Sequence, residues 1–292
     1  MTTPQPVPVV LAGGHESDGG RDLAGLVIPG SGAPAGHGPV VHAAAPAGRP
    51  LAEAVRSALV AGGGAPVCVV PMTLGRDPKL VADTARALRW LAAGEGCGRL
   101  ALTAPFGAAG HLVGWLRAAA ASAGSGDAVL VTAPAAGPFE DAELFRIARL
   151  VRQYGRHRTV EVAFAGGDPG PAEGVERCRL LGADRITAVP ASFGPALPEG
   201  LRDGGVRDGG PLLRPSAIAG VVAARTAAAL HLLGHGEDGI AAGLDAEHGH
   251  GYVHSHGPAE DHHDHHHSHS STHPHPHSRS HTPASTPAHT PH

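Results

Sequence analysis

Short apolar runs alternate with longer amphipathic segments over the first 240 residues. Six runs, rich in Val, Ala and Leu, have the length of strands: residues 7–13, 66–74, 99–107, 128–134, 160–166 and 185–194. Strands without polar alternation are typical of a parallel sheet covered by helices on both faces. Helix-length segments separate the runs, and Gly closes several of them, as expected after a helix end. This order of elements predicts an α/β fold.

The pattern repeats at an offset of about 120 residues. Three pairs of segments carry the repeat: VVLAG (9–13) with VLVTA (129–133), EAVRSAL (53–59) with EGVERCR (173–179), and VVPMTLG (69–75) with AVPASFG (188–194). A solenoid would repeat every 20 to 50 residues or so, roughly a third of this spacing. The sequence therefore predicts two similar lobes, at residues 1–124 and 125–240, each with a parallel sheet flanked by helices.

The remaining segment, residues 241–292, is rich in histidine: 16 of the 23 histidines lie at or after His248. With so little apolar content, it cannot offset its chain entropy by forming a core, so we expect a disordered tail. Its densest cluster comprises His262, His263, His265, His266 and His267. Neutral imidazoles bind divalent metals with little selectivity, and acid releases them. A solubilising tail or an expression tag are the alternatives, but the scattering of histidines among Ser, Pro and Asp argues against a tag.

Charge and composition exclude several partners. A formal charge of −4 and only two Trp, two Tyr and five Phe speak against a nucleic-acid binder, which needs a basic face and stacking rings. No run approaches the ~20 consecutive apolar residues of a membrane span, and no basic residue precedes the first apolar run, so we expect a cytoplasmic protein without a secretory leader. Cys68, Cys97 and Cys178 are too far apart for a zinc knuckle, and we expect them to be small buried hydrophobic residues.

Candidate chemistry lies where the strands end, because ligands of parallel sheets bind beyond the carboxyl ends of the strands. His15, Asp77 and His111 each follow an apolar run. Imidazole and carboxylate groups suit cobalt, nickel, zinc or ferrous iron. The sequence thus predicts a metal site of these three side chains. Helix capping is the alternative for Asp77 and His111.

The other histidines carry weaker signals. His231 and His235 are four residues apart, so on a helix they share a face and could hold one metal, although a solvated helix end is the commoner explanation. Leu232 lies where a metalloprotease would have its glutamate. We expect His42 and His157 at the surface. The sequence contains neither a Gly-x-x-x-x-Gly-Lys phosphate loop nor a Gly-x-Ser-x-Gly nucleophile motif.

A specific resemblance lies mainly in the second lobe, in AELFRIARLV (142–151) and VEVAFAGGDPGPAEGVERCRLLGADRITAVPASFGPAL (160–197). With the His-x-Ser pattern at His15, these segments make residues 7–230 similar to the class II tetrapyrrole chelatases, the sirohydrochlorin cobalt chelatase and ferrochelatase family, in its long two-lobed form. The resemblance implies insertion of cobalt, iron or nickel, as a substrate, into sirohydrochlorin or a similar ring of cobalamin or sirohaem synthesis. It implies no organic cofactor, and a monomer or homodimer.

The same resemblance assigns roles to residues. His15 is the catalytic ligand or base, in a His-Glu-Ser-Asp context where the family has His-Gly-Ser-Arg. The family's second histidine follows a Gly-Arg pair and is replaced here by Asp77, while its acidic residue falls near Pro46. The second-lobe position equivalent to His15 is Ala135. Because of these departures, a second reading stays open: a non-catalytic protein that stores or delivers nickel, cobalt or zinc through its tail.

Overall fold

The structure, a computed structural model, describes residues 6–26, 39–197, 201 and 205–247. The predicted metal-binding cluster at His262, His263, His265, His266 and His267 lies outside the described residues.

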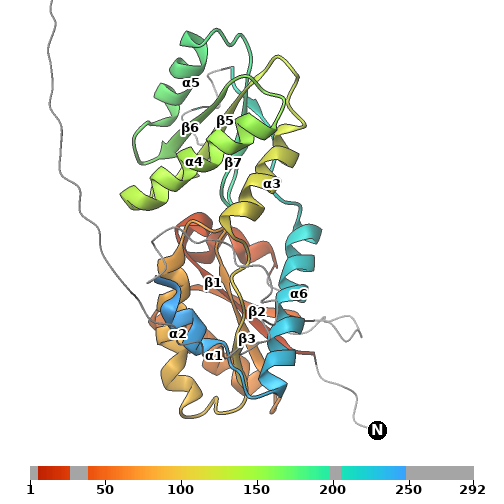
Figure 1. The fold of residues 1–292 in the computed structure, drawn as a ribbon. Helices are drawn as coiled ribbons and strands as arrows, with labels where there is room; N and C mark the ends of the chain where they lie inside the picture. The colour runs from red at the N-terminus through yellow and green to blue at the C-terminus, as the bar shows by residue number, and fades with distance from the viewer. Residues whose placement is uncertain (1–5, 27–38, 198–200, 202–204, 248–292) are drawn as a thin grey trace, which may run out of the picture. The chain divides into compact units, whose positions relative to one another are not determined.

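Two four-stranded parallel sheets form the framework (Figure 1). The first has the order β2-β1-β3-β4 and is built from β1 (Pro8–Gly13), β2 (Val40–Pro46), β3 (Val67–Met72) and β4 (Leu100–Leu102). The second has the order β6-β5-β7-β8 and is built from β5 (Ala128–Pro134), β6 (Val160–Ala165), β7 (Ile186–Pro190) and β8 (Arg207–Asp208). The identical order confirms the α/β fold with two similar lobes.

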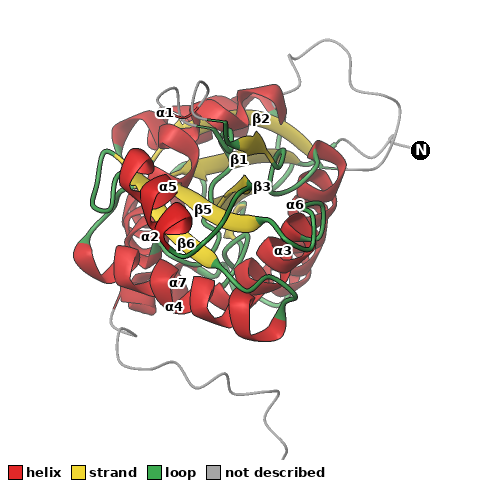
Figure 2. Ribbon diagram, turned by 90° about the horizontal axis from the view of Figure 1, so that it is seen from above, coloured by secondary structure: helices red, strands yellow, loops and turns green. Residues whose placement is uncertain are grey.

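Helices surround both sheets (Figure 2). They are α1 (Arg49–Ala61), α2 (Pro78–Ala92), α3 (Ala109–Ala120), α4 (Pro138–Tyr154), α5 (Pro171–Leu180), α6 (Pro215–Gly234) and α7 (Ile240–Leu244), with the 3-10 segments η1 (His15–Leu26) and η3 (Asp245–Glu247). Five of the helices have Pro in their first two positions, where its missing N–H leaves no hydrogen bond unmade.

The central strands β1, β3, β5 and β7 are almost entirely apolar because each buries both faces. In β1, Val9 and Leu11 face a core that both lobes share, whereas Val10 and Ala12 face a separate core beneath α1 and α2. In the second sheet, one face joins the shared core and the other packs on α5. Burial on alternate sides removes the polar alternation that a half-exposed strand would show.

Two helices are exchanged between the lobes. Helix α3 follows the first sheet in sequence but packs against β7 and α4 of the second. Helix α6 follows the second sheet and packs against β3 and β4 of the first, burying Ile218, Val222 and Ala229. The two sheets therefore fall on either side of residue 124, as the repeat predicts, while the helices near the end of each half cover the other half's sheet.

The chain stays folded beyond residue 241, where the tail was expected to begin. Helix α7 and η3 pack against α2, the N–H of Leu102 donates to the carbonyl oxygen of Asp238, and Ile240 is buried in the core beneath α2. The predicted start of the tail is therefore too early by at least seven residues. Helix α7 has only five residues and η3 only three, which is too short for a periodic pattern to be recognised in the sequence.

Helix α6 comes nearest to a membrane span by length and composition, although Arg225 and His231 interrupt its apolar run. Within the described part of the chain it alone is long and apolar enough to cross a membrane, with 20 residues and a mean hydropathy of 1.5. In this fold one face of α6 packs on β3 and β4, and 22% of its most apolar window is buried. A helix apolar on all sides gives no amphipathic period, which is why the sequence analysis passed over it.

Of the three cysteines, Cys68 and Cys178 are buried as expected, and burial raises the pKa of each thiol to about 12. Cys97 is exposed, contrary to expectation, because it lies in the turn between α2 and β4.

Candidate functional site

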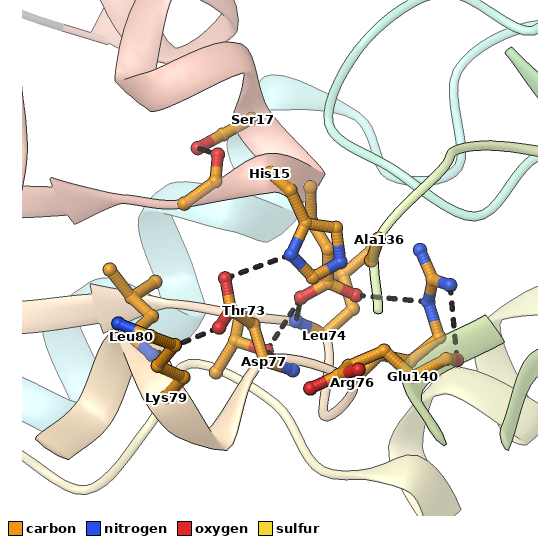
Figure 3. A network of polar contacts seen from close by, with 12 residues as sticks. His15, Ser17, Thr73, Leu74, Arg76, Asp77, Lys79, Leu80, Ala136 and Glu140 are labelled. Carbon is orange, nitrogen blue, oxygen red and sulfur yellow. Dashed lines mark hydrogen bonds and ion pairs between the residues drawn. The ribbon is translucent and has the colours of Figure 1, made fainter. Parts of the chain in front are cut away.

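His15 and Asp77 meet where two neighbouring strands end. His15 begins η1 directly after β1, and Asp77 lies between β3 and α2. Because β1 pairs in parallel with β3, their carboxyl ends lie together, and His15 Nδ1 is 3.0 Å from Asp77 Oδ2 (Figure 3). The side chain of His15 is 21% exposed and that of Asp77 is 11% exposed, so the pair is largely shielded from solvent.

Asp77 serves two partners at once. Its Oδ1 accepts the N–H of Leu80 at 2.9 Å and so caps the first turn of α2, while Oδ2 faces His15. Burial raises the pKa of Asp77, but the hydrogen bond and charge of His15, with the N–H of Leu80, outweigh it and hold this pKa below its ordinary value. The capping role considered from the sequence is confirmed, and Asp77 stays ionised beside His15 at neutral pH.

A glycine makes the contact possible. A Cβ atom on Gly14 would lie only 2.2 Å from Asp77 Oδ2, well inside van der Waals distance. Only a residue without a side chain therefore lets the carboxylate pass close to the backbone before His15.

The other ring nitrogen of His15, Nε2, is buried and has no hydrogen-bond partner in the described part of the chain. When Nδ1 donates its proton to Asp77, Nε2 carries the lone pair. The arrangement thus presents one oriented acceptor that can take a proton or bind a metal ion.

A second, fully buried pair lies beside the first. Glu16 and Arg76 have no exposed side-chain surface, and Arg76 Nε is 3.5 Å from Glu16 Oε1. Glu16 Oε2 accepts from Thr73 Oγ1 at 2.5 Å and from the N–H of Leu74 at 2.8 Å. Burial raises the pKa of the Glu16 carboxyl, although Arg76 and the hydroxyl of Thr73 act in the opposite direction.

The hydroxyl of Thr73 also organises the loop that carries Arg76 and Asp77. It accepts the N–H of Gly75 at 3.0 Å and the N–H of Asp77 at 3.1 Å while donating to Glu16. One buried hydroxyl therefore links the backbone before α2 to the carboxylate that follows His15.

The sequence analysis missed Glu16, Arg76 and Thr73 as members of the site. Glu16 and Arg76 are next to His15 and Asp77 in the chain, and Thr73 follows β3. The sequence did not indicate the two charged residues because a charged residue in a loop is usually solvated. Their burial depends on the second lobe, which the local pattern does not reveal.

His111 does not join His15 and Asp77. Its Nδ1 accepts the N–H of Ala108 at 3.2 Å at the start of α3, and its ring stacks on Trp115 with the centroids 5.6 Å apart. This is the capping role that the sequence left open. Among the residues that the structure describes, no group of three or more His, Cys, Asp or Glu side chains could hold a metal ion.

Pro46 and Ala135 lie where the resemblance to chelatases would place functional groups, and the described part of the fold brings no replacement to either position. Pro46 ends β2 as the ladder partner of Gly13, so no carboxylate reaches the end of β1 from that strand position. Ala135, after β5, packs so closely on Gly167 that a Cβ on Gly167 would lie 2.7 Å from the methyl group of Ala135. The polar chemistry is therefore concentrated at the end of the first sheet.

Of the remaining histidines, His157 differs most from expectation. It is only 5% exposed, with Nε2 2.8 Å from the carbonyl oxygen of Ala120 and Nδ1 3.2 Å from that of Asp127. The predicted surface role is wrong: its arginine neighbours in sequence lie at the surface while the ring turns inward. His42 bonds Ser57 near the surface, as expected.

His231 and His235 share one face at the end of α6, as their spacing predicts. Their rings are 4.8 Å apart in an edge-to-face arrangement, and both residues are exposed. This matches the solvated helix end that the sequence favoured.

Comparisons with known proteins give a structural relative and no family. No protein-family model matches the chain, and no curated protein matches it. The solved structure of DR2241 from Deinococcus radiodurans, described as a multi-domain protein with structural similarity to chelatases and two additional novel domains, aligns with a TM-score of 0.44 at 19% identity. The match covers 77% of this chain and 55% of that one, so the chain spans about half the length of this relative.

Proposed function

We propose that this protein inserts a divalent metal ion into a tetrapyrrole ring, with His15 as the reacting residue. The observation that carries the proposal is Nε2 of His15, which has no hydrogen-bond partner among the described residues. It belongs to a side chain that is 21% exposed and whose ring is oriented through Nδ1 by Asp77. The resemblance of residues 7–230 to class II chelatases supplies the reaction class. Cobalt and iron into sirohydrochlorin are the combinations that this resemblance favours.

The chemistry asks little of the protein. As the ring nitrogens replace water on the metal, two pyrrole N–H protons must leave, and a base placed at the ring speeds this step. Once it has released the metal, Nε2 of His15 accepts one proton and the second passes to solvent water. The ionised Asp77 stabilises the imidazolium that results, as a carboxylate does for histidine in other sites. In this proposal Asp77 orients His15, because both of its oxygens already have protein partners.

The metal ion is a substrate in this scheme. A resident site would need several protein ligands, whereas a chelatase needs only a brief contact before the macrocycle supplies four nitrogens. A single imidazole fits this demand, and imidazole binds cobalt, nickel and iron alike, with affinities set largely by the metal. We place the protein in the cytoplasm, where thiols such as Cys97 stay reduced.

The His-rich tail favours a second candidate function, metal storage or delivery. Sixteen histidines in the last 45 residues offer many ligands in a short stretch of chain. Attached to a chelatase, the same segment would raise the metal concentration near His15, since a tethered ligand acts at a high effective concentration. The two candidates differ in whether the folded part accelerates a reaction.

The test is an absorbance assay of the full-length protein with sirohydrochlorin and Co²⁺. We expect insertion faster than in buffer alone, a loss of about 10²-fold or more in His15→Ala, and no change in His42→Ala, the matched surface histidine. Changing His262, His263, His265, His266 and His267 to Ser should slow insertion only when metal is limiting. If wild type gives no acceleration yet binds several metal ions, and the five-histidine variant binds fewer, storage is the function.

A further inference from the structure

The His15–Asp77 pair and the buried Glu16–Arg76 pair are made of residues adjacent in the chain. Glu16 comes directly after His15, and Arg76 comes directly before Asp77. With one peptide bond separating the groups, a shift of Glu16 or Arg76 moves the backbone that carries the reacting pair.

Both inner residues are anchored on the second lobe. The carbonyl oxygen of Glu16 accepts the N–H of Phe193, from the segment after β7, at 2.8 Å. Nη1 of Arg76 donates to the carbonyl oxygen of Glu140 at 3.4 Å and lies 3.8 Å from Asp141 Oδ1, both in the first turn of α4 (Figure 3). His15 and Asp77 belong to the first lobe, yet their nearest neighbours in sequence bind the second.

The two buried side chains attract each other by charge and not through a hydrogen bond. Nε and Nη2 of Arg76 and Oε1 of Glu16 lack hydrogen-bond partners within the described residues, and the Nε–Oε1 distance of 3.5 Å is long for a hydrogen bond. Removing either charge would leave the other buried without compensation, which is far more costly than losing an exposed pair. The contact between lobes is therefore sensitive to a single substitution at its centre.

From this arrangement we infer that Arg76 and Glu16 are positioning residues that make the His15–Asp77 contact depend on the second lobe. When Arg76 holds the start of α4, the loop before α2 and the start of η1 stay in register, and His15 Nε2 stays buried. When this tie is lost, the backbone that carries His15 and Asp77 loosens, their contact is made less often, and the ring of His15 becomes more accessible to reagents. The inference rests on the proposed function only in taking His15 and Asp77 as the reacting pair.

The experiment measures accessibility of His15 directly in the full chain. Diethylpyrocarbonate acylates accessible imidazole nitrogens, and peptide mapping by mass spectrometry reports the rate at each histidine separately. We expect the His15 rate to rise about tenfold in Arg76→Met, as local opening becomes more populated, and to return toward wild type in Arg76→Lys, which keeps the charge. Asp141→Asn should raise it less, since Asp141 is the more distant partner. Glu143→Gln on the same helix, away from Arg76, is the matched control.

Two histidines serve as internal standards. His42 reports the reactivity of the reagent, and the buried His157 reports unfolding of the whole protein. A rise at His15 alone, with His42 and His157 unchanged, supports the inference. An unchanged His15 rate in Arg76→Met overturns the inference. If Arg76→Met unfolds, Asp141→Asn decides: a rise at His157 as large as the rise at His15 in this variant also overturns the inference. Since neither metal nor tetrapyrrole is added, failure here is separate from failure of the chelatase assay.

Discussion

Substituting Gly14 by alanine should break the contact between His15 and Asp77 without changing either of these two residues. The new Cβ would lie 2.2 Å from Asp77 Oδ2 and 3.1 Å from Leu80 Cδ2. Relief of the first contact requires the carboxylate to retreat by about 1 Å. The present Nδ1–Oδ2 distance of 3.0 Å would then exceed the range of a hydrogen bond.

The cost follows from the two bonds that Asp77 makes. A hydrogen bond to a charged group contributes about 1.5–3 kcal/mol, and a helix cap about 1 kcal/mol. Because both sides of the His15 contact retain some exposure and alanine also restricts the unfolded chain, we expect a net loss of about 2–3 kcal/mol. With a urea dependence of about 3 kcal/mol per molar for a fold of this size, the midpoint of unfolding falls by about 0.7–1 M.

A double-mutant cycle by urea denaturation tests the cause. If the clash is with the Asp77 carboxylate, deleting that group in Asp77→Ala should remove most of the penalty, so Gly14→Ala should cost under about 1 kcal/mol in that background. An equal cost in both backgrounds would refute the reasoning, because it would place the clash in the backbone or at Leu80.

Three further predictions follow from buried groups. The folded pKa of Asp77 lies below its ordinary 3.8, so the stability that its carboxylate contributes is complete above that pH and is lost as the pH falls through the lowered value. The urea midpoint should therefore fall below about pH 4, and it should fall less in Asp77→Asn. His157→Phe should cost about 1–3 kcal/mol by removing the buried ring nitrogens that face the carbonyl oxygens of Ala120 and Asp127, whereas His42→Phe should change the urea midpoint little. Val222→Ala on α6 should lower the thermal midpoint by the equivalent of about 1–3 kcal/mol, and more than Val221→Ala at the half-buried next position.

The sheets could be predicted because burial on both faces leaves a clear mark in the sequence. Six strands, the duplication and the meeting of His15 with Asp77 all follow from apolar runs and from the rule that parallel strands end together. Strand β2 was missed because it is half-exposed and rich in alanine, which has little strand propensity. Strand β8 has only two residues, too few for any period.

The inner half of the candidate site could not be predicted, since it depends on contacts between lobes. In the sequence Glu16 and Arg76 look like ordinary loop charges, but in the fold both side chains are buried and each residue forms a hydrogen bond to the second lobe. His157 misled for a related reason: Arg156 and Arg158 beside it point to solvent exposure, yet the ring is directed toward carbonyl oxygens at the ends of α3 and the start of β5. Sequence pattern reports a residue's neighbours along the chain, and burial of charge is decided by neighbours in space.

The exchange of α3 and α6 governs the order in which this protein can mature on the ribosome. The strands of the first sheet are all synthesised by residue 102, but the helix that covers β3 and β4 ends at Gly234. Until more than a hundred further residues emerge, that face of the sheet lacks its cover, and loop closure over such a separation is slow. A gene split at residue 124 would yield two fragments that each carry the other's helix, so we expect them to be insoluble apart and to regain structure only when expressed together.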